Sequence, residues 1–320
     1  MRKITSGDRV CIYLDQFVIS NLVDETTDTW KKVKMQLEKG FAQGVLYCPL
    51  SGQHFLETAK KRLESALIHH DYFLSLSENY FFKDDPFLTT QLISSLIRGN
   101  KHTLNTFLEK QQFKKFEDIY ADINLKNEIF DESITHKLSG QNELRKVLDT
   151  NMKEPLELQF MGVITAMEIQ NFIEALEQYL RVGQMRIRPD DYGKHSFPYW
   201  IDQLLYILTT KHKFRESQFK MLLAELKKNG FRRIPTLNIK FSLGGYLAVK
   251  NKQENTGDHI DLMRICIGLI SSDIFFTDKK RKSEIHALGL DTLYNTRVFS
   301  GTEQDLHEFL TLLESFQVKA

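Results

Sequence analysis

Apolar residues near the N-terminus form short continuous runs separated by amphipathic segments. Residues 10–14 (VCIYL) make the first run, which stops at Asp15, and residues 45–48 (VLYC) make the second. Short apolar runs rich in β-branched and aromatic residues are typical of buried parallel strands. The intervening segments, 17–22 and 27–41, have the spacing of a short and a longer helix. The chain is therefore predicted to begin with strand and helix in alternation.

The C-terminal end shows the same alternation. Residues 274–277 (IFFT) and 298–299 predict two further strands,. Helices are expected over 239–249, from Asp258 or Asp261 to Ile270, over 279–288 and over 302–316,.

Between about His69 and Gly230 the pattern has helical periodicity, and strand signals are nearly absent,. Neither end of the chain provides enough strands for a stable sheet by itself. We therefore expect one α/β core built from both termini and interrupted by a large all-helical insertion. The expected segments are 1–68 for the N-terminal half of the core, 69–230 for the insertion and 231–320 for the C-terminal half.

Composition places the chain among ordinary globular proteins, with 320 residues, 42% hydrophobic and 27% charged,. A formal net charge of +1 argues against a uniformly basic nucleic-acid binder, although a local basic face can lie beside an acidic pocket. The three cysteines lie in apolar runs without Cys-x-x-Cys spacing, which predicts reduced core thiols,. The polar start of the chain and the lack of a long apolar run favour a cytoplasmic protein that does not enter a membrane.

Acidic residues accompany the predicted strands at both ends. They are Asp15 after the first strand, Glu57 on a helix predicted to begin after Ser51, Asp258 and Asp261 at the start of a late helix, and Asp278 after the next strand. Carboxyl ends of parallel strands meet at one edge of the sheet, where open α/β sheets bind ligands. The sequence therefore predicts an acidic site at that edge.

This placement resembles the PIN-domain nuclease superfamily. In that family an Asp ends the first strand, an acid lies on an early helix, an Asp opens a late helix, and a Thr/Ser-Asp pair follows the next strand. The resemblance covers roughly residues 8–68 and 232–301. It implies a PIN-like α/β/α core and a nuclease, with RNA favoured over DNA as the substrate. For the third acid it favours Asp261, with Asp258 as an additional ligand.

The chemistry of these residues agrees with the resemblance. Hard cations such as Mg²⁺ or Mn²⁺ take oxygen ligands, and clustered carboxylates stay ionised together when cations offset their repulsion. A bound metal lowers the pKa of its water and stabilises charge on the leaving oxygen of a phosphodiester. We therefore expect all five acids to be catalytic and metal-binding residues.

Each acid also has a structural explanation. Asp15 and Asp278 could cap the helices that follow them, and Asp258 and Asp261 could complement a helix dipole. Glu57 could pair with a lysine one turn away on its own helix.

Neighbouring polar residues are candidates for substrate contacts. Gln16 and Thr277 flank two of the acids, and His54 lies one turn before Glu57, where it could contact the scissile phosphate,. Lys279 and Lys280 follow Asp278 and suit a polyanionic backbone.

Two other functions use the same residues. One is a non-catalytic PIN-like scaffold or binding module, and the other is a metal-dependent phosphatase. The helical insertion could also carry a homodimer interface or bind a regulatory protein.

Overall fold

The computed structural model describes residues 9–110, 115–146, 154–192, 198–250 and 252–317. Contacts divide the chain into two compact units. Unit 1 comprises Met1–Lys83, Thr103–Asn127 and Ile267–Ala320, and unit 2 comprises Asp84–His102 and Glu128–Cys266. The helical middle expected over 69–230 is thus shared between the units.

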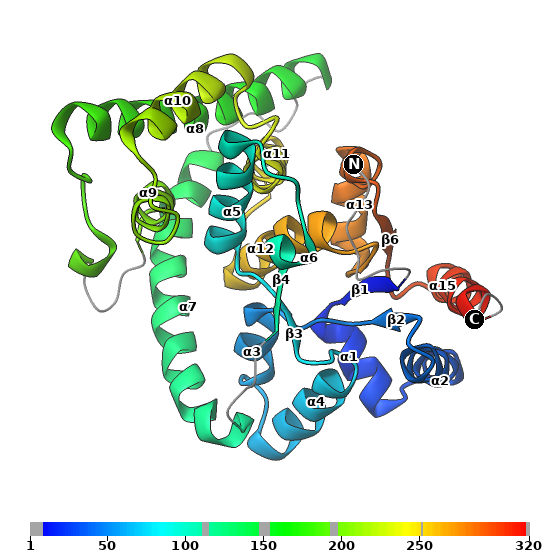
Figure 1. Ribbon diagram of the computed structural model, residues 1–320. Coiled ribbons are helices and arrows are strands. Elements are labelled where there is room, and N and C mark those ends of the chain that lie inside the picture. The colour runs from blue at the N-terminus through cyan, green and yellow to red at the C-terminus, as the bar shows by residue number, and fades with distance from the viewer. Residues whose placement is uncertain (1–8, 111–114, 147–153, 193–197, 251, 318–320) are drawn as a thin grey trace. The chain divides into compact units, whose positions relative to one another are not determined.

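A parallel sheet of four strands lies at the centre of unit 1 (Figure 1). Two strands come from the N-terminal end, β1 (Val10–Leu14) and β2 (Leu46–Tyr47). Two come from the C-terminal end, β5 (Ile274–Phe276) and β6 (Arg297–Phe299). The order across the sheet is β2-β1-β5-β6. The expected α/β class, with a parallel sheet built from both ends of the chain, is confirmed.

Helices of unit 1 follow the strands along the chain. They are α1 (Gln16–Asp24), α2 (Asp28–Ala42), α3 (Gly52–Thr58), α4 (Leu63–Ser75), α6 (Leu104–Phe107), α13 (Lys279–Ala287), α14 (Leu290–Tyr294) and α15 (Glu303–Gln317). Two further helices, α7 (Phe116–Lys146) and α12 (Thr256–Ser271), contain residues of both units.

Aromatic packing joins the two ends of the chain on one side of the sheet. The Phe276 ring of β5 lies 5.8 Å from Trp30 of α2 and 5.1 Å from Phe309 of α15, measured between ring centroids. These rings are almost fully buried, and large aromatic side chains contribute much of the stabilising apolar area in a core. Helices α2 and α15 consequently pack side by side.

One part of the middle region differs from the sequence prediction. Residues 80–82 (β3, Tyr80–Phe82) and 108–110 (β4, Leu108–Lys110) form a two-stranded antiparallel sheet where no strand was expected. Each strand has only three residues, which is too short for an alternating pattern to appear. The prediction that this region lacks strands is therefore wrong.

Unit 2 consists of helices over the residues that the structure describes. They are α5 (Asp85–Arg98), α8 (Glu154–Val182), α9 (Trp200–Thr210), α10 (Glu216–Asn229) and α11 (Pro235–Val249), with a 3₁₀ helix at Pro189–Asp191. The Trp200 indole packs against the rings of Phe172 and Phe241 at 5.3 and 5.1 Å. This contact places Trp200 in a helix–helix core.

The three cysteines are buried and free, as the sequence predicts for core thiols. Among the described helices, none combines the length and the apolar run needed to cross a lipid bilayer.

Gly268 of α12 provides a test of how tightly this core is packed. A methyl group on its Cα would lie 2.3 Å from two ring atoms of Phe275 and 3.3 Å from Cγ of Tyr13. Both rings are buried, so they cannot move aside without disturbing their neighbours. We predict that Gly268→Ala lowers the free energy of unfolding, measured by urea denaturation, by about 1–3 kcal/mol.

The matched control is Gly162→Ala on α8, where an added Cβ meets no atom within 4 Å. Removing a helical glycine there is expected to leave the stability unchanged or to raise it by up to about 1 kcal/mol. Equal effects of the two substitutions would contradict the packing argument.

Candidate functional site

Asp15 lies at the carboxyl end of β1, in the middle of the sheet. Its backbone N–H donates to the Phe276 carbonyl of β5 at 3.1 Å. Its side chain is 4% exposed and caps α1, because Oδ1 accepts the Gln16 N–H at 2.6 Å. A carboxylate offers about four acceptor positions, so capping a helix and binding a cation are compatible roles.

Thr277 and Asp278 occupy the equivalent position after β5. The Thr277 N–H donates to the Phe299 carbonyl of β6 at 3.0 Å, and its buried hydroxyl donates to Asp15 Oδ2 at 3.4 Å. Asp278 caps α13 by accepting the Arg281 N–H at 3.0 Å. Two aspartates therefore end adjacent parallel strands, and the threonine beside one contacts the other.

Helix α3 is fixed to the end of β1 at two points. The His54 Nε2 atom lies 2.8 Å from the Leu14 carbonyl oxygen, and the Thr58 hydroxyl donates to Gln16 Oε1 at 3.1 Å. The two residues that they contact precede and follow Asp15 in the chain. Both points of attachment therefore flank the first candidate acid.

Glu57 shares the attached face of α3. It lies three residues after His54 and one before Thr58, and residues at i, i+3 and i+4 lie on the same side of a helix. Glu57 is half-buried. The attachment thus puts a third carboxylate on the helix face that meets the Asp15 end of β1.

His54 acts by positioning α3. The Ser51 N–H donates to Nδ1 at 2.9 Å, which assigns the proton to Nε2 and makes Nε2 the donor to the Leu14 carbonyl,. The ring is 1% exposed and packs against Phe73 and Tyr13 at centroid distances of 4.3 and 5.1 Å. In this arrangement neither ring nitrogen is available to a substrate phosphate.

Gln16 has an unsatisfied donor beside the acids. The side chain is 7% exposed, its carbonyl oxygen accepts from Thr58, and its Nε2 atom is buried without a hydrogen-bond partner among the described residues. An unmade hydrogen bond of this kind costs about 1–3 kcal/mol. An oxygen atom of a ligand or an ordered water would remove that cost.

The first turn of α13 is strongly basic. It contains Lys279, Lys280, Arg281 and Lys282. Cations at the positive end of a helix dipole are unfavourable, by about 0.3–1 kcal/mol each at exposed positions. The buried Arg281 side chain donates to Glu284 at 2.5 Å, whereas Lys279 and Lys280 are exposed. Two exposed ammonium groups thus follow Asp278 although the helix itself disfavours them.

Asp258 and Asp261 belong to unit 2. Helix α12 begins at Thr256, so Asp258 lies in its first turn and Asp261 in its second. Asn255 and Asp258 exchange hydrogen bonds, since each side chain accepts the backbone N–H of the other at 2.9–3.0 Å. Asp261 Oδ1 accepts from Arg264 at 3.3 Å. Asp258 thus takes part in capping the start of α12, which is the structural explanation that its position allowed. A metal site that includes Asp258 or Asp261 together with the acids of unit 1 stays a prediction.

The strand-end acids have the donor chemistry of a hard cation. No group of three or more His, Cys, Asp or Glu side chains that could hold a metal is found within the part of the chain that the structure describes. Mg²⁺, however, usually binds proteins through one or two carboxylates and keeps several waters or substrate phosphates as its other ligands. Asp15 and Asp278, which follow adjacent strands, are the candidates for that smaller requirement, and metal binding by them stays a prediction.

The carboxyl edge of the sheet also holds a carboxylate that the sequence patterns did not predict. Asp305 of α15 is 5% exposed, and its Oδ2 accepts the backbone N–H of Ser300, directly after β6, at 2.7 Å. Its Oδ1 accepts from Lys282 of α13 at 2.6 Å. The spacing Thr302-x-x-Asp305 is a capping-box pattern, and the Thr302 hydroxyl does accept the Asp305 N–H at 3.3 Å. The Thr302-x-x-Asp305 spacing was therefore the feature of the sequence from which a role for Asp305 at a helix start could have been predicted.

Comparisons of the chain with models of protein families, with curated proteins and with solved structures give no match. A functional assignment therefore rests on the residues and their geometry.

Asp305 gives a prediction about pH. Burial alone would raise the pKa of this carboxyl, but hydrogen bonds from Lys282 and Ser300 hold the pKa below its ordinary value of 3.8. The ionised form is thus favoured in the folded state, so its stabilisation is present above about pH 4 and is lost as the pH falls through the lower folded-state pKa. We predict that Asp305→Asn lowers the free energy of unfolding near pH 7 by about 1–3 kcal/mol.

The difference between parent and Asp305→Asn should shrink in urea denaturation at about pH 3. A difference that is the same at both pH values would show that the charge of Asp305 does not contribute.

Proposed function

We propose that the chain is a Mg²⁺- or Mn²⁺-dependent nuclease that hydrolyses phosphodiester bonds within a strand, with RNA favoured over DNA as the substrate. One observation carries the proposal: Asp15 and Asp278 follow adjacent parallel strands, and the hydroxyl of Thr277, the residue before Asp278, donates to Asp15. Open α/β sheets bind their ligands at this edge. Glu57, on the attached face of α3, supplies a third carboxylate.

Each candidate residue would have a distinct role in phosphodiester hydrolysis. Asp15 and Asp278 would hold the cation, with Glu57 as a further ligand or as the acceptor for a metal-bound water. The cation would supply an activated water and stabilise the leaving oxygen. The buried Gln16 amide and the Thr277 hydroxyl would orient oxygen atoms at the site, and His54 would keep α3 in place.

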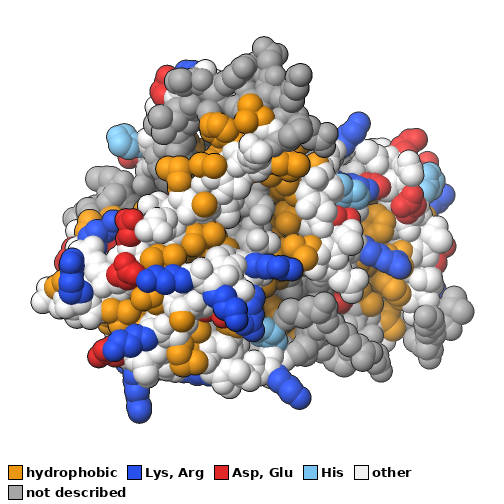
Figure 2. Space-filling view, turned by 90° about the horizontal axis from the view of Figure 1, so that it is seen from above, with side chains coloured by type: hydrophobic (Ala, Val, Ile, Leu, Met, Phe, Trp, Pro, Cys, Tyr) orange, Lys and Arg blue, Asp and Glu red, His pale blue; other side chains and the backbone are white. Residues whose placement is uncertain are grey.

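The exposed lysines support an anionic substrate. Lys279 and Lys280 begin α13 next to Asp278 in spite of the helix dipole,. A polyanionic backbone would offset that unfavourable placement. On the face seen in Figure 2, Lys and Arg side chains are interspersed with acidic and apolar ones. The described side chains on that face therefore form no broad basic surface. The preference for RNA comes from the resemblance to PIN-domain nucleases.

Removal of either strand-end charge should abolish cleavage. Asn caps helices about as well as Asp, so Asp15→Asn and Asp278→Asn keep α1 and α13 while they remove a metal ligand. We predict that each lowers kcat/KM for labelled single-stranded RNA in Mn²⁺ at least about 100-fold, since metal ions supply several kcal/mol of charge stabilisation. Asp24→Asn, at the exposed end of α1, is the matched control and should cleave like the parent.

Parallel assays on double-stranded RNA and single-stranded DNA establish the substrate class. Folded Asp15→Asn and Asp278→Asn variants that cleave every substrate as fast as the parent would refute the mechanism.

A non-catalytic scaffold is the second candidate. The observation in its favour is that Asp15 and Asp278 both cap helices, which gives each a structural reason to be present. Metal binding separates the two functions, because a ligand that binds only the folded protein raises its stability.

We predict that millimolar Mn²⁺ raises the Tm of the parent and of Asp24→Asn but not that of Asp15→Asn. At a concentration about 100 times the Kd the gain is about 2.7 kcal/mol. No shift in Tm, together with no cleavage of any substrate, would support the scaffold.

A further inference from the structure

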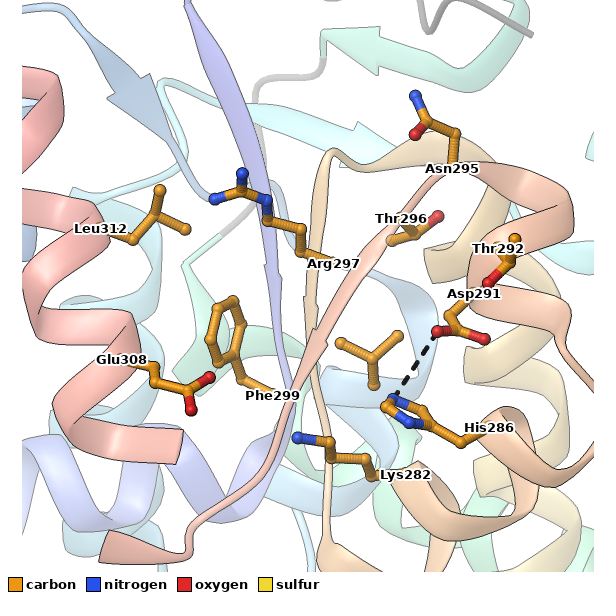
Figure 3. A pocket seen from close by; sticks show the side chains of 11 residues that line it. Lys282, His286, Asp291, Thr292, Asn295, Thr296, Arg297, Phe299, Glu308 and Leu312 are labelled. Carbon is orange, nitrogen blue, oxygen red and sulfur yellow. Dashed lines mark ion pairs between the residues drawn. The ribbon is translucent and has the colours of Figure 1, made fainter. Parts of the chain in front are cut away.

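A pocket of about 570 Å³ lies along β6 and extends to Lys282, whose ammonium group donates to Asp305 at the carboxyl edge of the sheet. Figure 3 shows β6 crossing the pocket between two helical walls. Glu308 and Leu312 of α15 line one wall, and His286 of α13 and Asp291 of α14 line the other. The pocket is thus a groove with a strand as its floor.

That strand exposes an unpaired edge. β6 is the last strand of the sheet, and no other strand within the described ranges pairs with it on its outer side. The Arg297 N–H donates to the Asp273 carbonyl at 3.1 Å, and the Phe299 carbonyl accepts from Thr277 at 3.0 Å, so both residues direct their backbone groups toward β5. Backbone groups alternate in direction along a strand. The N–H and C=O of Val298 therefore point outward, into the groove.

The walls of the groove favour a single extended segment as the partner of β6. Paired strands lie about 4.8 Å apart, and the side chains of α13, α14 and α15 line the groove on both sides of β6. A second copy of the chain would bring its own α13, α14 and α15 toward these walls as its β6 approached. A single extended segment has no such walls and can enter the groove.

The charges in the groove indicate which segment fits. On the α13–α14 wall the His286 imidazole lies 3.8 Å from the Asp291 carboxylate, as the dashed line in Figure 3 marks, and the two form an ion pair only when the imidazole is protonated. On the α15 wall the Glu308 carboxylate accepts from Gln304 at 3.0 Å. The exposed Arg297 guanidinium has no partner among the described residues. A segment that carries an acidic side chain opposite Arg297 would provide that partner.

We propose that this groove binds an extended acidic peptide segment of a partner protein, which adds to the sheet as a strand beside β6. Backbone hydrogen bonds to Val298 supply affinity, and alternate side chains supply specificity. An acidic side chain on the α15 face pairs with Arg297 next to the apolar Leu312. Peptide binding at this groove does not require the proposed nuclease activity, because the groove contains none of the candidate acids.

The test uses the whole chain and three capped hexapeptides. The first alternates valine and glutamate, the second has lysine in place of glutamate, and the third is the first with every backbone amide N-methylated, so that neither edge of the peptide can donate to β6. Peptide binding is measured by fluorescence anisotropy, and hydrogen exchange of the Val298 amide is measured by NMR. The peptide concentration is raised to about 1 mM, because a Kd of that size corresponds to a binding free energy of only about 4 kcal/mol.

The parent should bind the glutamate peptide at least about tenfold more tightly than the lysine peptide, which corresponds to one charge pair of about 1.4 kcal/mol. The Val298 amide should exchange more slowly in that complex, and the N-methylated peptide should not bind. Arg297→Glu should reverse the preference between the two charged peptides. Lys32→Glu, an exposed cation on α2, is the control and should leave the preference unchanged.

Three outcomes would overturn the proposal. The first is no binding of the glutamate peptide at the highest concentration. The second is equal binding of all three peptides, which would exclude strand addition. The third is a dimer of the parent in analytical ultracentrifugation that Arg297→Glu dissociates, which would assign this edge to a second copy of the chain.

Discussion

Unit 1 depends on the pairing of β1 with β5. The two strands are separated by some 260 positions in the sequence, as shown by the hydrogen bond from the Cys11 N–H to the Asp273 carboxylate at a separation of 262 residues. At the other end of the strands the Asp15 N–H donates to the Phe276 carbonyl. Parallel strands need a long crossover connection, and the entropy of closing a loop grows only with the logarithm of its length. A large intervening segment is therefore compatible with this sheet.

The same pairing creates the candidate site. Asp15 ends β1 and Asp278 follows β5, so any arrangement that pairs these strands in register brings the two residues to one edge. Each aspartate also begins a helix, where free N–H groups and the dipole favour a carboxylate. Helix capping and cation binding require the same chemical group at the same place. The presence of an aspartate there therefore does not distinguish the two roles. A substitution to asparagine does, because it removes the charge and keeps the helix cap.

The sequence was most informative where the structure is local. The run at 10–14 coincides with β1, and the helix expected over 279–288 corresponds to α13 (Lys279–Ala287), because an apolar run bounded by Asp marks both a strand end and a cap. It failed for β3 and β4, whose pairing joins residues about 30 positions apart and leaves no periodic pattern,. Side-chain partners were equally inaccessible. The two attachments of α3 to β1 and the contact of Asp305 with Ser300 depend on packing between distant segments, which spacing does not encode.

The acidic edge and the β6 groove meet in one strand. The Phe299 carbonyl of β6 fixes the Thr277 N–H, and the Thr277 hydroxyl contacts Asp15. One residue before Phe299, the Val298 backbone faces the groove. A segment that pairs with Val298 would restrain β6, and through the Phe299 carbonyl it would restrain Thr277, whose hydroxyl contacts Asp15. Coupling between two sites requires such a shared element and is reciprocal in free energy. If the two ligands are coupled through β6, metal at Asp15 must therefore change the affinity of the groove for its peptide by the same factor as the peptide changes the affinity for metal.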